Sequence, residues 1–178
     1  MTPFRRKQLV GIAGALPACV LVALTLDHAG DLFGFVALPA DDPSSRLAFA
    51  LRWMLLPGFC LLLGVVVAGR RGFVADAIDG TREPASHGLE ITLRYNQNTL
   101  EQTLLAGIAW ANLAINLPIA HLVLIPAMAT LFAIGRGAFW VGYLIYPTGR
   151  AFGMVLAALP TIASYAWVAW RAYCGWAE

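Results

Sequence analysis

Apolar residues form five long runs along the chain, separated by short segments that carry most of the charge. Each run is close to the roughly 20 residues that an α-helix needs to cross about 30 Å of hydrocarbon. Pro118 marks a tight break between the third and fourth runs. The pattern therefore predicts an all-α integral membrane bundle with five transmembrane helices. The predicted spans are Gln8–Leu26, Leu47–Gly69, Thr99–Leu117, Ile119–Tyr146 and Ala151–Trp170.

Composition leaves little material for a water-soluble domain. Hydrophobic residues make up 60% of the 178 residues and charged residues 12%, with a mean hydropathy of +0.71. A soluble domain is about 25% charged. The three cysteines show no metal-ligand spacing and predict no disulfide framework, and no basic patch suggests nucleic acid. We therefore expect one membrane-embedded unit with lipid around it and no metal.

Basic residues collect on one side of the predicted spans. The other side has four aspartates but only Arg46 and Arg171. Because Lys and Arg are retained in cytoplasmic segments, we expect a cytoplasmic N-terminus, an outer C-terminus and a bacterial inner membrane. The first run resembles a signal peptide, but we expect a retained helix. The basic groups are Arg5, Arg6 and Lys7; Arg70, Arg71, Arg82 and Arg94; and Arg136 and Arg150.

Three polar residues share one predicted helix face near the start of the third span. Arg94, Asn98 and Glu101 are spaced i, i+4, i+7. Ionisable groups in a membrane helix cost a few kcal/mol each, so they usually face the interior and carry function. The simpler alternative is a structural ion pair between Arg94 and Glu101. Asn112 and Asn116 lie further along and are interpreted as interhelical hydrogen-bonding residues.

The fourth span repeats this pattern at its cytoplasmic end. Arg136 and Tyr143 are i, i+7, and Arg150 follows a Pro-Thr-Gly break. Guanidinium groups bind carboxylates and phosphates bidentately. The simpler alternative is that Arg136 and Arg150 are anchors that reach to the interface. Taken together, the polar groups on this side favour an anion-binding pocket.

These residues resemble the signature of the MAPEG family, the membrane-associated proteins in eicosanoid and glutathione metabolism. The stretch 90–102 carries an Arg followed by Asn at +4 and Glu at +7, as on the family's second helix. The stretch 136–143 is similar to the Arg-x6-Tyr pattern of its third helix. Arg150 falls where the family's leukotriene-synthase branch has its thiol-activating arginine. The resemblance implies a four-helix core over 47–178, with 1–46 as an added transmembrane helix and outer loop.

The resemblance also implies a ligand, a partner and residue roles. Family members form homotrimers that bind glutathione as co-substrate between neighbouring subunits, near the cytoplasmic face. Arg150 is implied to be catalytic. The residues implied to contact glutathione are Arg94, Asn98, Glu101, Arg136 and Tyr143.

Three functions stay open on the sequence. The first is a glutathione-dependent transferase or peroxidase acting on lipophilic electrophiles, with the thiolate stabilised by Arg150. The second is a non-catalytic lipid-binding scaffold of the five-lipoxygenase-activating-protein type. The third is a small anion transporter, which the absence of sequence repeats and paired broken helices disfavours. The retained Arg150 and Tyr143 favour the enzyme.

Overall fold

The computed structural model describes residues 2–73, 86–146 and 148–175, and every regular element in these ranges is helical. The predicted all-α class is confirmed. The elements are α1 (Pro3–Asp27), α2 (Ala29–Phe33), α3 (Pro43–Trp53), α4 (Leu55–Ala68), the 3-10 turn η1 (Gly69–Phe73), α5 (His87–Asn116), the 3-10 turn η2 (Ile119–Val123), α6 (Leu124–Ile145) and α7 (Ala151–Tyr173).

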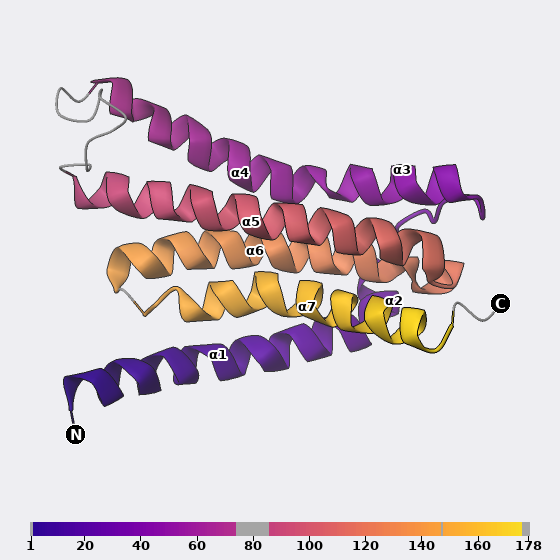
Figure 1. The fold of residues 1–178 in the computed structure, drawn as a ribbon, viewed down its shortest axis with the longest axis horizontal. Coiled ribbons are helices and arrows are strands. Elements are labelled where there is room, and N and C mark those ends of the chain that lie inside the picture. Colours follow the sequence, from indigo (N-terminus) through magenta and orange to yellow (C-terminus); the bar gives the residue numbers. More distant parts are fainter. Residues whose placement is uncertain (1, 74–85, 147, 176–178) are drawn as a thin grey trace.

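The long helices lie side by side along one direction, with α3 and α4 forming a single bent rod (Figure 1). The helix α6 is the central one: 61% of its most apolar window is buried, against 11% for α1. In the described part of the chain, four helical segments are long and apolar enough to cross a membrane: Gln8–Asp27, Pro43–Phe73, Ile119–Ile145 and Ala151–Tyr173. The molecule is therefore a helical membrane bundle.

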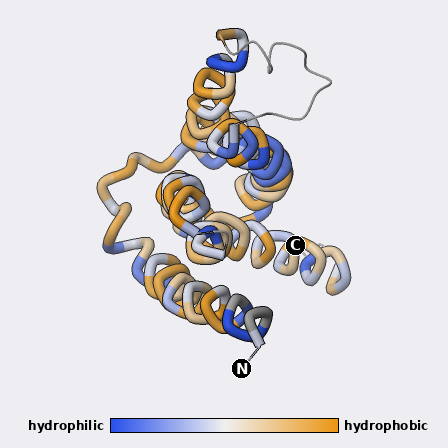
Figure 2. Tube along the Cα trace, turned by 90° about the vertical axis from the view of Figure 1, so that its left-hand side faces the viewer, coloured by the Kyte–Doolittle hydropathy of each residue, from blue (hydrophilic) through white to orange (hydrophobic). Residues whose placement is uncertain are grey.

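The helix α5 runs the length of the bundle, but its composition does not mark it as a span. Its 30 residues extend for about 45 Å, and it packs against α3, α4, α6 and α7. Figure 2, viewed from the end where α5 begins, shows hydrophilic residues gathered along α5 among mainly hydrophobic neighbours. Polar residues thus lower the hydropathy of the helix that carries the predicted site.

Several helices begin earlier than the apolar runs. The third predicted span starts at Thr99, whereas α5 starts at His87, and the second starts at Leu47, whereas α3 starts at Pro43. Hydropathy marks the part of a helix suited to hydrocarbon, while hydrogen bonding extends beyond it. Asp42 illustrates the local start signal: its carboxylate accepts from the Ser45 N–H at 2.9 Å, the usual N-cap arrangement before a proline.

Glycines let α6 and α7 approach backbone to backbone. A Cβ added at Gly135 would lie 2.7 Å from the Gly153 carbonyl oxygen, and one added at Gly142 would lie closer still to the Gly149 carbonyl oxygen. Small residues at membrane helix interfaces permit this close packing. The contact fixes the end of α6 against the start of α7, and so brings Tyr143 beside Arg150.

The predicted basic groups gather at one end of the bundle, where α1 and α5 begin, α4 ends and α6 turns into α7 (Figure 1). Arg82 lies outside the described residues. This grouping agrees with the charge pattern, whereas the side of the membrane that it faces stays a prediction.

Among the described residues, Asn112 and Asn116 do not make the interhelical hydrogen bonds that the sequence predicts. The Asn112 amide donates to the Ile108 carbonyl and the Asn116 amide donates to the Asn112 carbonyl, each at 2.8 Å. Both bonds stay within α5, because an asparagine side chain easily reaches the carbonyl one turn earlier.

Candidate functional site

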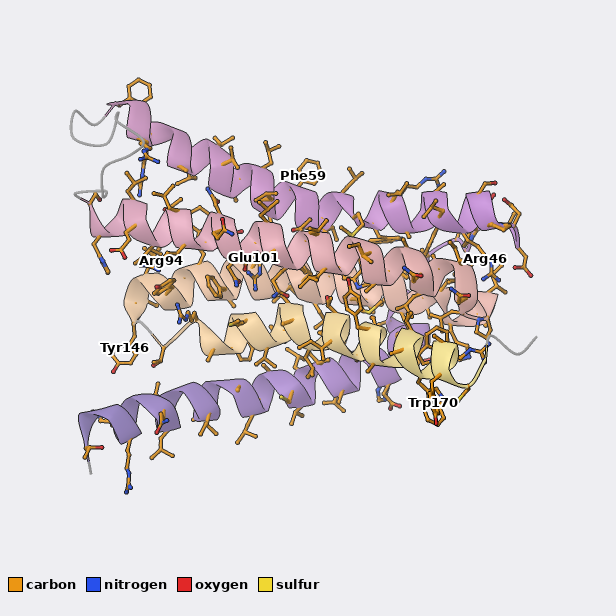
Figure 3. The ribbon with its side chains drawn as sticks, viewed as in Figure 1. Arg46, Phe59, Arg94, Glu101, Tyr146 and Trp170 are labelled. Atoms are coloured by element: carbon orange, nitrogen blue, oxygen red, sulfur yellow. The ribbon has the colours of Figure 1, made fainter. Side chains whose placement is uncertain are left out.

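A small hollow of about 250 Å³ opens on the exposed face of α5, beside the ends of α6 and α7 that meet. It contains five of the six predicted site residues; Arg136 is the exception. Figure 3 shows Arg94 and Glu101 on this half of the molecule. The lining residues are Arg94, Gln97, Asn98, Glu101, Phe139, Tyr143, Arg150 and Met154.

The α5 wall is organised by bonds between successive turns. The Arg94 Nε donates to the Glu90 carboxylate at 3.0 Å, and the Gln97 amide donates to the Glu101 carboxylate at 2.7 Å. Arg94 therefore pairs with Glu90, and the alternative of a structural Arg94–Glu101 pair is wrong. Glu101 has no cationic partner among the described residues, so its carboxylate is available to a cation.

Arg136 lies beneath the hollow and does not line it. Its side chain is fully buried, and its Nη1 donates to the Asn98 Oδ1 at 2.7 Å. The guanidinium carbon lies 5.4 Å from the Phe132 ring centroid and 4.8 Å from that of Phe139. Its Nε and Nη2 have no hydrogen-bond partner among the described residues. In this conformation Arg136 acts through Asn98, whose side chain it orients.

Arg150 and Tyr143 form the other wall. The Arg150 guanidinium carbon lies 4.8 Å from the Tyr143 ring centroid, a distance typical of a cation–π contact. Arg150 is exposed and immediately precedes α7, while Met154 in the first turn of α7 also lines the hollow. The positive end of the α7 dipole and the Arg150 charge thus act on the same space.

The electrostatics of the hollow suit a ligand with more negative than positive charge. Arg94 and Arg150 line it, and Arg136 adds a buried positive charge below. Glu101 offers one carboxylate to a cationic group. Arg94 is partly neutralised by Glu90. A zwitterion with carboxylates and one ammonium matches this set.

Besides Phe139, which also lines the hollow, three residues at the site were missed from the sequence. Glu90 and Gln97 each lie four residues before a predicted site residue, and Met154 lies four residues after Arg150. The i, i+4 rule that identified the stripe could have found all three.

Comparison with known proteins gives few relatives. No protein-family model and no solved structure match the chain. Transmembrane protein 79 of Mus musculus and that of Bos taurus are each 29% identical to it over 162 residues. The matched region is 91% of this chain and 41% of each relative, so the chain spans less than half the length of the relatives it matches. The similarity agrees with a protein embedded in a membrane.

Proposed function

We propose that the chain is a MAPEG-like, glutathione-dependent transferase or peroxidase that acts on lipophilic electrophiles. One observation carries the proposal: Arg94, Asn98, Glu101, Tyr143 and Arg150 line a single hollow, with Arg136 bonded to Asn98 below it. These residues come from α5, α6 and the start of α7. They bring two arginines, a carboxylate, an amide and a phenol to one space.

Glutathione fits the charges of the hollow. Its two carboxylates pair with the cationic groups, of which Arg94 and Arg150 are exposed, and its ammonium group pairs with Glu101. Asn98 is held by Arg136, so its amide nitrogen is the part left to donate to the ligand. In this arrangement the groups that bind the ends of glutathione lie along α5, and Arg150 lies near the cysteinyl sulfur.

Arg150 stabilises the thiolate. A free thiol has a pKa near 8.5, and the thiolate is the nucleophile. A positive charge within about 4–6 Å lowers a pKa by about 1–3 units, and the N-terminus of α7 acts in the same direction. The thiol proton leaves to solvent, and the sulfur forms a bond to an electrophilic carbon. That carbon either loses its leaving group as an anion or, in an epoxide or activated alkene, breaks a C–O or π bond whose electron pair then takes up a proton from solvent. In the peroxidase variant, two glutathione molecules are oxidised to the disulfide while the hydroperoxide becomes an alcohol and water.

A second copy of the chain completes the site in this proposal. At about 250 Å³ the hollow is smaller than the roughly 300–1,000 Å³ of most ligand clefts. Arg94, Gln97 and Glu101 are exposed on α5, and exposure of such groups to lipid is costly. A homotrimer packed through this face, as the MAPEG resemblance implies, covers them. A mass measurement in mild detergent tests it, and a monomer would remove the intersubunit site.

The decisive experiment follows the thiolate. The absorbance of bound glutathione, titrated against pH, should give a thiol pKa below the solution value in the wild type and closer to that value in Arg150→Ala. Conjugation of a lipophilic electrophile should fall in the same variant, while glutathione affinity changes only a few-fold. Arg52→Ala is the matched control, because Arg52 is exposed and lines no part of the hollow.

Two results would favour other functions. Glutathione binding with an unshifted thiol pKa and no turnover across electrophiles and hydroperoxides would leave the lipid-binding scaffold. An absence of glutathione-induced thermal stabilisation in the wild type, and equally in Arg94→Gln and Glu101→Gln, would overturn glutathione as the ligand. The small anion transporter would then be tested by flux into vesicles.

A further inference from the structure

A second, larger cavity lies at the opposite end of the bundle from the proposed glutathione site. Its volume is about 1070 Å³, slightly above the usual upper size of clefts that hold small molecules. Figure 3 shows this end through Arg46 on α3 and Trp170 on α7, both of which line the cavity. The two sites share no lining residue, so a ligand here does not depend on the proposed glutathione site.

The walls of the cavity are mainly apolar. The helix α7 contributes the small residues Pro160 and Ala163, and Leu113 on α5 and Met128 on α6 form another part of the wall. Ser164 also lines the cavity, but its hydroxyl already donates to the Pro160 carbonyl at 2.7 Å. Small side chains on α7 thus leave space beside α5 and α6, and this space is suited to hydrocarbon.

The charged groups of the cavity are engaged within the protein. Arg46 donates to the Asp41 carboxylate at 2.9 Å and to the Leu117 carbonyl at 2.7 Å, so each of these two charged side chains neutralises the other. The Arg171 guanidinium lies 5.8 Å from the Trp167 ring centroid and has further contacts within the chain. A ligand with a buried charge would need a partner of opposite charge. The cavity therefore favours a neutral occupant.

Two polar side chains of the cavity keep hydrogen-bonding capacity. Asn116 ends α5, and its amide nitrogen donates to the Asn112 carbonyl at 2.8 Å, which leaves Oδ1 without a partner among the described residues. His121 follows in η2, is exposed, and its ring has no partner in the part of the chain that the structure describes. The amide oxygen only accepts, whereas a neutral imidazole has one N–H donor and one acceptor.

We propose that this cavity binds a neutral lipid whose head is a hydroxyl group. A hydroxyl both donates and accepts, so it donates to the Asn116 Oδ1 and accepts from the His121 N–H. A carboxylate accepts only, and could not bond to the Asn116 oxygen. An ammonium group would add a positive charge that Asp41, already paired, does not balance. The hydrocarbon part lies against Leu113 and Met128, and each buried methylene adds to the affinity through the hydrophobic effect.

The test uses the full chain in phosphatidylcholine nanodiscs and a dibrominated octadecanol as quencher of tryptophan fluorescence. Trp167 and Trp170 both line the cavity. Quenching by the alcohol should saturate at a low mole fraction, with a half-point about fivefold lower than that of its methyl ether, which has lost one hydrogen-bond donor. Linear quenching, equal for alcohol and ether, reflects collision within the bilayer and would overturn the proposal.

Two further probes define the head and the hydrocarbon part. Dibrominated stearate, measured at alkaline pH where it is ionised, should bind no more tightly than the ether. A lower half-point for stearate than for the alcohol would overturn a neutral ligand. A dibrominated cholestanol and its methyl ether repeat the comparison with a ring system, and the hydroxylated probe with the lower half-point distinguishes a sterol from a long-chain alcohol.

A pair of asparagine variants tests the head-group contact. Asn116→Leu removes the acceptor and should abolish the difference between alcohol and ether. Asn112→Leu is the matched control, because Asn112 makes the same kind of bond within α5, to the Ile108 carbonyl at 2.8 Å, but does not line the cavity. This control should keep the difference between alcohol and ether. The same response in both asparagine variants would contradict a hydroxyl bound at Asn116.

Three further variants test the donor and the space. His121→Phe keeps a ring but removes the N–H, and should raise the half-points of alcohol and ether several-fold. Ala163→Phe fills the cavity from an exposed position on α7 and should raise both half-points as well. Ala169→Phe is its control, since Ala169 is also exposed on α7 but does not line the cavity. Unchanged half-points in His121→Phe, or equal responses of the two alanine variants, would contradict a lipid in this cavity.

Discussion

Arg46, close to one end of the bundle, and Arg136, further inside on α6, are two arginines whose surroundings differ. The Arg46 side chain is 11% exposed. Its Nε donates to Asp41 at 2.9 Å, and its Nη1 donates to the carbonyls of Ala114, Ile115 and Leu117 at 3.2, 3.2 and 2.7 Å. The Arg136 side chain is fully buried, yet its one hydrogen bond to a described residue goes to Asn98.

The difference separates an arginine that stabilises the fold from a buried arginine whose hydrogen bonds are only partly made. Arg46 satisfies carbonyls that a helix end leaves without partners, and a carboxylate balances its charge. Arg136 keeps two buried N–H groups, on Nε and Nη2, without described partners, and such groups are uncommon in folded proteins. We therefore expect Arg46 to raise the free energy of unfolding whether or not a ligand is bound. We expect Arg136 to lower the free energy of unfolding of the ligand-free protein, while it orients Asn98 in the site.

The largest expected effect is the loss of Arg46. Arg46→Met should lower the free energy of unfolding in detergent by about 3 kcal/mol, because several charge-assisted bonds are lost and the last carbonyls of α5 remain unsatisfied. The exposed Arg52 on the same helix is the control. Arg52→Met should change the unfolding free energy by less than about 0.5 kcal/mol. Equal losses of unfolding free energy in the two variants would show that the bonds from Arg46 to the last carbonyls of α5 do not stabilise the fold.

The bond between Asn98 and Arg136 is expected to contribute somewhat less. Asn98→Ala should cost about 2 kcal/mol, because it removes the acceptor for a buried charge. In an Arg136→Met background the same change should cost much less, and the double-mutant cycle isolates the coupling. Additive losses would mean that Asn98 stabilises the bundle independently of Arg136.

Arg136 itself should give an effect of the opposite sign to Arg46. Arg136→Met should raise the unfolding free energy of the protein without ligand by about 1–2 kcal/mol, because a hydrophobic side chain that replaces a buried charged one is often stabilising. The thermal stabilisation by glutathione should disappear in this variant. A large destabilisation without ligand would make Arg136 a second structural arginine and remove the contrast.

The smallest expected effect is the loss, at low pH, of the stability that Asp42 contributes as the N-cap of α3. Hydrogen bonds from Ser44, and then from Ser45, hold the pKa of Asp42 at about 2, below its usual 3.8. Because the pKa of the folded state is depressed, the stability contribution is present above about pH 3.8 and is lost as the pH falls toward 2. Asp42→Asn keeps a good helix cap without the titrating charge. The difference between the wild-type and Asp42→Asn melting temperatures should shrink over that interval, whereas a constant difference would exclude the linkage.

Sequence spacing located the α5 face and its partners on α6 and α7, because i, i+4 and i, i+7 positions define a helix face without knowledge of packing. It did not distinguish Arg136 beneath the hollow from Arg150 beside it, since burial depends on how α6 is rotated against α5. The role of Arg46 was also missed. Its carbonyl acceptors lie 68 to 71 residues away along the chain, and no local pattern reports such a contact.

The packing of α1 has a consequence for how the protein is made. The side chains of Ala18 and Val22 on α1 form a core cluster with Leu131 on α6 and Leu156 on α7, and Gly14 lies beside Phe152. The main neighbour of α1 is α7. During synthesis α1 is therefore complete more than a hundred residues before α7 begins. Until α7 is made, α1 lacks these contacts, so it has to be stable in lipid without them. Its most apolar window, with a mean hydropathy of 2.4, meets that requirement. The helix α5 is made after α3 and α4, against which it packs, so it depends less on its own hydropathy and can carry the charges.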